Sequence, residues 1–473
     1  MVEQSTGKGP RLTCSAVLEA TGGRLVQGDR EASFAGLSTD SRTLKGGEVF
    51  LALKGERFDG HAFVEEALSR GASGVIVEEG DLPSGVFGRV GASPVIGVSD
   101  TLRALGDIAR FWRDRFTLPV VCLTGSNGKT STKEMIASVL EESFTVLKNP
   151  GNFNNLVGVP LTLLELQPRH QVAVVEIGTN VPGEIRRLAE IARPTTGLIT
   201  NIGQAHLEGM GSLEALIREK GDLFRSIPEE GVVIVNRNDP HVSSLAGECR
   251  ARKIGFAVEG RADVVVDRLQ WRGTRGVRFR LTVGGKRVSV DFPLLGEQFV
   301  HNAAAAAAVA FLLGIEPEAI GRRLERFSPL PMRMEPLCLE GVNFINDTYN
   351  ANPPSVEMAL RALCHVSGGA RAFVVLGDML ELGEISREAH RAVGRVLGGL
   401  DLAGVFLLGE YAPEVAEGAI EAGTDRRRVC ILESHAEIAR LLKGETRPGD
   451  WVLVKGSRGM RMERVIEILG EEA

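Results

Sequence analysis

The residues of this chain that are best suited to chemistry form one continuous run: Thr124, Gly125, Ser126, Asn127, Gly128, Lys129, Thr130 and Ser131. The glycines let backbone N–H groups approach phosphate oxygens, and the N-terminus of a following helix adds the positive end of its dipole. Lys129 would reach the outer phosphates, and the hydroxyl group of Thr130 would hold Mg²⁺. Because Leu123 stands where the strict phosphate-loop pattern has its first glycine, the alternative is a plain strand-to-helix turn with a surface lysine.

Three further candidates lie outside this run. Glu176 ends an apolar run that predicts a buried strand, and His206 follows a further predicted strand at 197–202. A carboxylate at the carboxyl end of a parallel strand is well placed to bind Mg²⁺, and we favour that role for Glu176 over an ion-paired strand end. We favour a site role for His206 because it also follows a strand end. Lys220 lies in a predicted helix, 212–224, where an ordinary helical lysine is the default.

Polar loops supply candidates for binding a larger substrate. The loop 149–155 is rich in amide side chains that could bind a peptide or a sugar, namely Asn152, Asn154 and Asn155. Two polar loops near the N-terminus hold Ser41, Arg42, Lys54, Gly55, Asp59 and His61. Ligands bind at strand ends in α/β folds, although ordinary solvated loops would also be polar.

The order of predicted elements indicates an α/β protein of three domains. The predicted domains are a small α/β unit at 1–118, a central phosphate-loop domain at 119–330, and a Rossmann-like domain with a mostly parallel sheet at 331–473. The first boundary is Leu118-Pro119, where proline ends a helical pattern. In the central domain the loop lies between a buried strand, 120–123, and a helix, 132–142. Alternating residues between 263 and 292 predict a small antiparallel insertion.

Composition limits the possible partners. The chain has 473 residues and a formal net charge of −6, which does not favour nucleic-acid binding. No segment approaches the ~20 apolar residues of a membrane span. The six cysteines are scattered without metal-binding spacing. We therefore expect a cytoplasmic protein with no membrane span and no nucleic-acid partner, and a monomer is the working expectation.

Longer motifs resemble those of the Mur ligases, the ATP-dependent amide-forming enzymes of peptidoglycan precursor synthesis. The resemblance runs from about Ser38 to Arg464, and the family shares the shortened phosphate loop that lacks the first glycine. Three motifs are similar to those of the member that adds D-alanyl-D-alanine: Gly151-Asn152-Phe153-Asn154-Asn155-Leu156-Val157-Gly158-Val159-Pro160, Asp347-Thr348-Tyr349-Asn350-Ala351-Asn352-Pro353 and Gly377-Asp378-Met379-Leu380-Glu381-Leu382-Gly383.

The resemblance implies a role for each matching residue. Lys129 and Thr130 would hold ATP and Mg²⁺, and Glu176 and His206 would be metal ligands. Lys220 stands where relatives carry a carbamylated lysine, so Lys129, His206 and Lys220 are the implied catalytic residues. ATP would be contacted across a domain interface by Asn302, Arg333, Asp347 and Asn350. The loops that contain Ser41, Arg42, Lys54, Gly55, Asp59 and His61 resemble a uridine-nucleotide site.

This chain departs from the family pattern at one place. Relatives have a His-Asn pair shortly before the nucleotide-binding asparagine, and this chain has Gln298-Phe299, while Asn302 remains.

The implied reaction joins D-alanyl-D-alanine to UDP-N-acetylmuramoyl-tripeptide through an acyl phosphate, with ATP and Mg²⁺. Three alternatives stay open from the sequence. One is the Mur ligase that adds the third peptide residue, although its Asp-Asn-Pro motif is missing after residue 331. The others are a phosphate-loop kinase or switch NTPase, and a binding module that uses nucleotide only for assembly.

Overall fold

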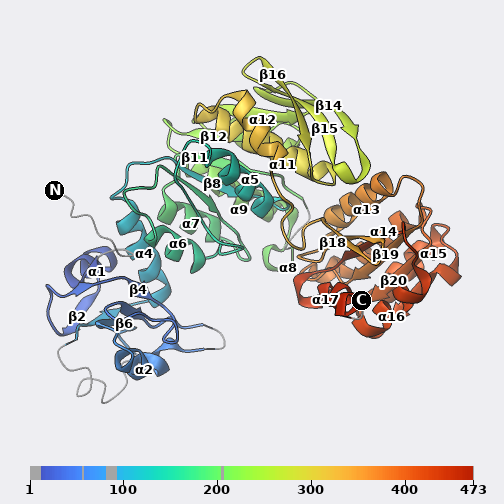
Figure 1. Ribbon diagram of the computed structural model, residues 1–473. Helices are drawn as coiled ribbons and strands as arrows, with labels where there is room; N and C mark the ends of the chain where they lie inside the picture. Colours follow the sequence, from blue (N-terminus) through green and yellow to red (C-terminus); the bar gives the residue numbers. More distant parts are fainter. Residues whose placement is uncertain (1–11, 56–57, 81–92, 204–206, 472–473) are drawn as a thin grey trace.

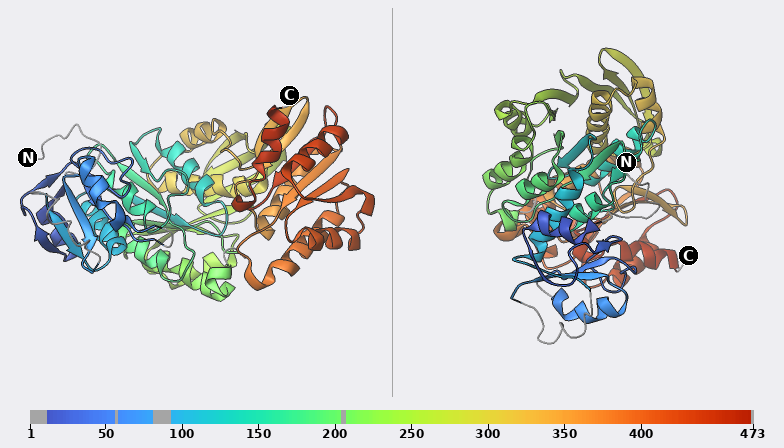
Figure 2. Two further views of the ribbon diagram at one scale, coloured as in Figure 1. Left: turned by 90° about the horizontal axis from the view of Figure 1, so that it is seen from below. Right: turned by 90° about the vertical axis from the view of Figure 1, so that its left-hand side faces the viewer.

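The computed structural model describes residues 12–55, 58–80, 93–203 and 207–471. Figure 1 shows three α/β bodies in a row, with the N-terminal body at one end and the C-terminal body at the other. The left view in Figure 2 shows the same arrangement from below. The predicted α/β class is confirmed. Each body has its own main sheet, which supports the division at 1–118, 119–330 and 331–473 that we keep as a proposal.

The N-terminal body is built on a five-stranded sheet in the order β2-β7-β6-β5-β4. Strands β4 to β7 pair in parallel, and β2 joins β7 in antiparallel fashion. A separate two-stranded pair joins β1 and β3. The elements are β1 (Leu12–Thr13), α1 (Cys14–Thr21), β2 (Arg24–Gln27), β3 (Ser33–Phe34), β4 (Leu37–Ser38), β5 (Val49–Leu51), η1 (Gly60–Phe63), α2 (Val64–Ser69), β6 (Gly74–Glu78), β7 (Val95–Val98) and α4 (Thr101–Arg113).

The central body has a nine-stranded sheet in the order β16-β15-β14-β13-β12-β11-β8-β10-β9. Its parallel strands are β8 (Val120–Thr124), β9 (Val146–Lys148), β10 (Val172–Glu176), β11 (Thr196–Ile199), β12 (Val232–Asn236), β13 (Arg252–Val258) and β14 (Val264–Trp271). Of these, β8, β10, β11 and β12 are buried along their whole length and therefore appear in the sequence as mostly apolar runs.

The predicted antiparallel insertion extends this same sheet. Strand β14 pairs in parallel with β13, and then in antiparallel fashion with β15 (Val277–Val283), which pairs with β16 (Lys286–Phe292). The central helices are α5 (Lys129–Leu140), α6 (Gly158–Leu164), α7 (Glu184–Ala192), α8 (Leu207–Met210), α9 (Leu213–Arg225), α10 (Pro240–Glu248), α11 (Glu297–Leu312) and α12 (Pro317–Glu325).

Helix α11 lies against α5 and the central sheet (Figure 1). Its run Ala303–Ala308 is fully buried. Alanine loses no side-chain entropy in a helix and allows a close approach of neighbouring backbones. The packing therefore brings the N-terminal turns of α11 close to the start of α5, where the phosphate loop ends.

The C-terminal body has a six-stranded sheet in the order β17-β18-β22-β19-β20-β21. All neighbours pair in parallel except β17 and β18, which confirms the predicted mostly parallel sheet. The elements are β17 (Glu335–Leu339), β18 (Val342–Asp347), α13 (Pro353–Ser367), β19 (Ala372–Gly377), η3 (Gly383–Ile385), α14 (Ser386–Gly398), β20 (Gly404–Leu408), α15 (Ala412–Glu421), β21 (Val429–Leu432), α16 (His435–Glu445), β22 (Trp451–Lys455) and α17 (Glu463–Glu471).

Side-chain contacts join the three bodies. The indole N–H of Trp112 in α4 donates to the carbonyl of Leu166 at 3.1 Å, and Arg113 donates to the carbonyl of Ala192 at 3.1 Å. At the other joint, the rings of Trp271 in β14 and His365 in α13 stack with centroids 5.1 Å apart. Among the described residues, no helix combines the length and apolar character needed to cross a membrane.

Candidate active site

The run 124–131 forms a tight loop between β8 and α5. Gly125 has φ 153°, and a Cβ atom there would lie 1.9 Å from the hydroxyl oxygen of Thr200. Gly128 has φ 78°, and its Cβ would lie 2.6 Å from the side-chain oxygen of Asn302. A side chain at either position would fill space that the loop and its neighbours already use. The helix begins at Lys129, three residues before the predicted start, so its N-terminal turn belongs to the loop.

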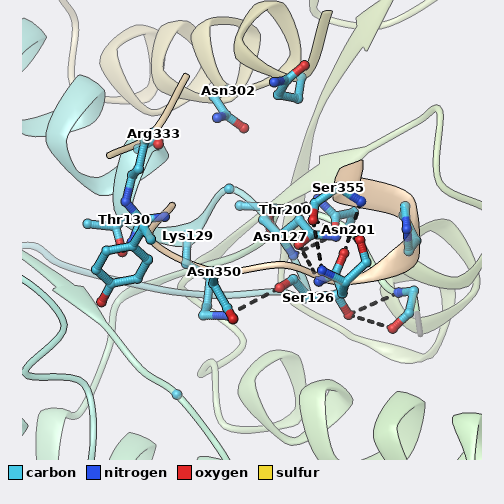
Figure 3. Close-up of a pocket in the computed structure, with 18 of the residues that line it drawn as sticks. Ser126, Asn127, Lys129, Thr130, Thr200, Asn201, Asn302, Arg333, Asn350 and Ser355 are labelled. Atoms are coloured by element: carbon cyan, nitrogen blue, oxygen red, sulfur yellow. Dashed lines mark hydrogen bonds between the residues drawn. The ribbon is translucent and has the colours of Figure 1, made fainter. Parts of the chain in front are cut away.

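The end of β11 holds this loop in place. The backbone N–H of Ser126 donates to the carbonyl of Asn201 at 2.9 Å, and that of Asn127 donates to the Asn201 side chain at 3.0 Å. The Thr200 hydroxyl donates to the carbonyl of Asn127 at 2.7 Å. Figure 3 shows these residues together. Sequence reasoning did not identify Thr200 or Asn201, although they directly follow β11 at the edge of the sheet where Glu176 ends β10.

Lys129 is half-buried in the first turn of α5. Its ammonium group donates to the carbonyl of Gly125 at 2.8 Å. Burial lowers the pKa of Lys129, and the positive charge of Arg333 adds to this, while Glu176 and Glu381 raise it. The side chain therefore lies over its own loop, at the edge of the cavity where phosphates would bind.

Glu176 and Thr130 offer oxygen ligands for a cation. Glu176 is buried at the end of β10, and Asn154 donates its amide to one carboxylate oxygen at 2.7 Å. The other oxygen is buried and makes no hydrogen bond. An orphaned carboxylate oxygen suits Mg²⁺, which is usually held by one or two carboxylates together with substrate phosphates. The described residues contain no cluster of three His, Cys, Asp or Glu, and His206 lies outside them.

Lys220 is buried in α9 and lines the same cavity. Its ammonium group donates to the carbonyl of Gly125 at 3.1 Å. Burial, and secondly the charge of Lys129, lowers its pKa well below the usual value. The neighbouring Glu219 accepts hydrogen bonds from the backbone N–H groups of Gly183 and Ile185, which ties α9 to the start of α7. Lys220 is therefore not an ordinary surface lysine.

The C-terminal domain provides the opposite wall. The guanidinium of Arg333 donates to the Thr130 hydroxyl at 3.1 Å and stacks on the ring of Tyr349, 3.8 Å from its centroid. Figure 3 shows Arg333 extending toward Thr130 and Lys129. Asn352 donates its side-chain amide to the side-chain oxygen of Asn127 at 2.7 Å. Two direct hydrogen bonds therefore join this domain to the phosphate loop.

Asp347 is held by its own domain. The buried ammonium group of Lys455 donates to one carboxylate oxygen at 2.5 Å, and the backbone N–H of Met334 donates to the other at 3.1 Å. Lys455 also donates to the carbonyl of Asn350 at 2.9 Å. These contacts fix the loop after β18 and direct it toward the cavity. Lys455, the last residue of β22, acts on the site through this loop.

Three polar atoms on one face of α11 have no hydrogen-bond partner: Gln298 Oε1, His301 Nδ1 and Asn302 Nδ2. The spacing of three and four residues places them on one helical face, and all three residues line the cavity. Burial lowers the pKa of His301, so the ring is neutral at physiological pH. Buried polar groups are rarely left unpaired, so this face is suited to a polar ligand.

Two buried side chains, those of Lys133 and Asn149, hold the amide-rich loop 149–155 in place. Lys133 of α5 donates to the carbonyl groups of Asn149 and Gly151 at 2.6 and 2.8 Å. The Asn149 side chain bonds the backbone N–H and C=O of Glu176. Asn155 accepts from the N–H of Gly158 at 2.8 Å at the start of α6. The loop is therefore attached to both β10 and α5, and it places Asn154 beside Glu176.

A cavity of about 850 Å³ lies between the central and C-terminal domains and is lined by residues of both. It brings together most of the residues singled out in the sequence: Ser126, Asn127, Gly128, Lys129, Thr130, Ser131, Asn152, Asn154, Asn155, Glu176, Lys220, Asn302, Arg333, Asp347 and Asn350. Thr124 and Gly125 lie behind the loop, outside the lining.

The N-terminal loops are not part of this cavity. The side chain of Arg42 is exposed and paired with Asp40 at 2.8 Å, whereas Ser41 is buried. His61 is buried, with Nδ1 at 2.5 Å from Asp59, and Nε2 accepts from the backbone N–H of Glu78 at 2.9 Å. Both ring nitrogens are engaged within the domain, so His61 holds its loop in place. A uridine site in these loops remains a prediction.

Three family descriptions match consecutive parts of the chain. They are "Mur ligase family, catalytic domain" at residues 33–113, "Mur ligase middle domain" at 123–310, and "Mur ligase, glutamate ligase domain" at 332–458. The UDP-N-acetylmuramoyl-tripeptide--D-alanyl-D-alanine ligase of Bacillus subtilis is 34% identical over 463 residues, which cover 98% of this chain and 99% of that protein.

Solved structures agree with this assignment. A crystal structure of MurF from Acinetobacter baumannii has a TM-score of 0.89 at 33% identity, covering 98% of this chain and all of that one. MurF ligase from Thermotoga maritima, in complex with ADP, has a TM-score of 0.82 at 30% identity, covering 92% of this chain and 97% of that one. Because the similarity in sequence and structure extends over nearly the whole length, this chain belongs to the Mur ligase family.

Proposed function

We propose that this protein is an ATP-dependent ligase that joins D-alanyl-D-alanine to UDP-N-acetylmuramoyl-tripeptide. The products are UDP-N-acetylmuramoyl-pentapeptide, ADP and phosphate. The observation that carries the proposal is the shared cavity, in which Lys129, Glu176 and Lys220 face Arg333 of another domain. The names of the full-length relatives support the substrates, and the ADP in the Thermotoga maritima structure supports the nucleotide.

The first step activates a carboxylate, which is unreactive toward amines at neutral pH. The terminal carboxylate of the tripeptide attacks the γ-phosphorus of ATP, ADP leaves, and an acyl phosphate forms. Phosphoryl transfer depends on positioning and charge neutralisation more than on covalent protein chemistry. Lys129 and Arg333 supply positive charge from two sides of the cavity, and backbone N–H groups of the loop supply further donors.

A divalent cation completes the site. Thr130 and Glu176 would hold Mg²⁺, together with His206, and the bound ion would neutralise charge on the transferring phosphate. We propose that Lys220 reacts with CO2 to form a carbamate, because its low pKa favours the neutral amine that this reaction needs. The carbamate would then supply a further anion near the cation.

The second step forms the amide bond. The dipeptide amine attacks the acyl carbonyl, and phosphate leaves. Water would hydrolyse the acyl phosphate, so the cavity must close before activation. Arg333 and Asn352 already contact the phosphate loop, and these contacts favour a closed arrangement of the two domains.

The assay that tests the function measures ADP release. We expect release to require both UDP-N-acetylmuramoyl-tripeptide and D-alanyl-D-alanine. A kinase or switch NTPase would release ADP without the dipeptide, and the ligase for the third residue would use a single amino acid instead. ADP release that does not change when the dipeptide is omitted would contradict the proposal.

The contact between Asn352 and Asn127 gives a prediction about nucleotide binding. In Asn352→Asp, the carboxylate still accepts the Ser355 N–H at the start of α13, so the helix stays capped. The variant loses the amide donor to Asn127 and places a negative charge beside the loop. We expect roughly tenfold weaker ADP binding by calorimetry, from the loss of one hydrogen bond and added repulsion.

Ser355→Ala is the matched control for this variant. It removes the hydroxyl that accepts from the Asn352 backbone N–H and leaves the interdomain contact intact. Unchanged ADP affinity in Asn352→Asp, or an equal loss in the control, would show that the interdomain contact does not support nucleotide binding.

The N-terminal domain would bind the uridine nucleotide through Ser41, Arg42, Lys54, Gly55 and Asp59. The substrates, a nucleotide precursor and ATP, place the reaction in the cytoplasm. We propose that the protein acts as a monomer.

A further inference from the structure

The second step needs an acceptor for a proton. Near neutral pH an α-amino group carries a proton, with a pKa of about 8, and an ammonium group has no lone pair to attack a carbonyl. The acceptor dipeptide must therefore lose a proton inside the closed cavity. A carboxylate that binds the ammonium group could also remove that proton.

Five carboxylates line the cavity among the described residues: Glu176, Glu184, Asp239, Asp347 and Glu381. Glu176 is the proposed metal ligand. Asp347 is paired with Lys455. Asp239 accepts two backbone N–H groups at the start of α10 and a third from Ile202, which follows β11. Glu184 accepts the backbone N–H groups of Asn180 and Val181.

Glu381 differs from the other four in its position. It is exposed and lies in the loop after β19, on the C-terminal domain, beside the exposed Leu380. Its charge acts on the Lys129 ammonium across the cavity. Glu381 is therefore on the C-terminal side of the cavity, where we also place the dipeptide, and its charge reaches the site of phosphoryl transfer at Lys129.

The backbone of Glu381 is in the left-handed region, with φ 65°. A bulky residue adopts this conformation at a cost of about 1–3 kcal/mol, and it persists only where the surroundings impose it. Such strain is typical of functional sites, where a side chain must point in one direction.

The residues before Glu381 are firmly held. The N–H of Met379 donates to Nε2 of the buried His390 at 2.9 Å, and His390 Nδ1 donates to the carbonyl of Ser386 at 2.6 Å. The N–H of Leu380 donates to the Ser457 hydroxyl at 2.8 Å. Asp378 accepts the N–H groups of Glu410 and Tyr411. Glu381 thus projects from a rigid support, as precise positioning requires.

We propose that Glu381 binds the ammonium group of the acceptor dipeptide and removes its proton. The proton moves to the carboxylate, and the freed lone pair forms the new C–N bond at the acyl carbonyl. The C–O bond to phosphate then breaks, its electron pair leaves with phosphate, and a second nitrogen proton goes to the departing phosphate. Glu381 is then a catalytic residue of the second step only.

Glu381→Gln tests this proposal, because glutamine keeps the shape but cannot take the proton. With D-alanyl-D-alanine we expect kcat/KM for ADP release to fall by about 10²-fold or more. Hydroxylamine, which is a neutral amine at pH 7, should still trap the acyl phosphate as a hydroxamate at close to the wild-type rate. Glu384→Gln, which alters a neighbouring exposed glutamate outside the cavity lining, should leave both activities unchanged.

Three results would overturn the proposal. The first is dipeptide activity close to wild type in Glu381→Gln. The second is a loss of the hydroxylamine reaction in Glu381→Gln that equals its loss of dipeptide activity. The third is a loss of dipeptide activity in Glu384→Gln that equals the loss in Glu381→Gln. The proposed role of Glu381 rests on the proposed function, and failure of that function would give a different experimental result. In that case the wild-type protein would form no hydroxamate that depends on UDP-N-acetylmuramoyl-tripeptide.

Discussion

Lys129→Ala is expected to lower ADP release by on the order of 10²-fold or more, because it removes a charge at the transferring phosphoryl group. The fold should be retained. Lys129 is the first residue of α5, its ammonium group contacts only loop carbonyls in this structure, and alanine is a good helix former. The measurement is the rate of ADP release with all three substrates, together with circular dichroism to check the fold.

Lys286→Ala is a suitable control for this change. Lys286 is exposed on β16 and pairs with Glu316 at 2.7 Å, far in the sequence from the loop. An exposed ion pair contributes little to stability, so the control should keep wild-type activity. ADP release close to the wild-type rate in a folded Lys129→Ala protein would refute the role of Lys129.

Lys220→Ala is expected to lose most activity, and a small carboxylic acid such as formate should restore part of it. If Lys220 carries a carbamate, alanine leaves a space that lacks an anion, and a small carboxylate can fill it. CO2 adds only to a neutral amine, and burial gives Lys220 the low pKa that this requires. A lower pKa increases the fraction of Lys220 that is neutral at pH 7, so burial favours the reaction with CO2.

Lys220→Arg provides the contrast. A guanidinium remains protonated and occupies the space, so formate should not restore its activity. Mass spectrometry of the intact protein under CO2 would give a readout that does not depend on turnover. Wild-type activity in Lys220→Ala, or equal rescue of the alanine and arginine variants, would show that Lys220 has no carbamate role.

Parallel strands such as β8, β10 and β12 could be predicted because burial on both faces makes each of them a mostly apolar run. Strand β17 escaped prediction because it is a half-exposed edge strand that begins with Glu335 and Pro336. Strand β21 is apolar, but it is a half-exposed edge strand of only four residues, Val429–Leu432, which is too short a run to mark a strand clearly. The start of α5 was predicted three residues too late, because its first turn is polar and belongs to the phosphate loop.

The residues of the candidate site also divide into those that a local sequence pattern could identify and those that it could not. Residues that follow strand ends or belong to dense motifs, such as Lys129 and Glu176, could be found along the chain. Contacts between distant parts of the chain could not be found in this way. Asn352 bonds Asn127 of the central domain, 225 positions away, and Lys455 pairs with Asp347 of its own domain, 108 positions away. No local pattern reports such a contact, and Arg333 was found only through the family resemblance.

The placement of tryptophan gives this protein optical reporters of its own motion. The chain has three tryptophans, and each occupies a different structural context. Trp112 lies at the joint between the N-terminal and central domains, Trp271 at the joint between the central and C-terminal domains, and Trp451 inside the last sheet. The ring of His365 is stacked on Trp271, so movement at this joint would change the surroundings of the indole. Variants that keep one tryptophan each would therefore follow the two joints separately by fluorescence, with Trp451 as an internal reference.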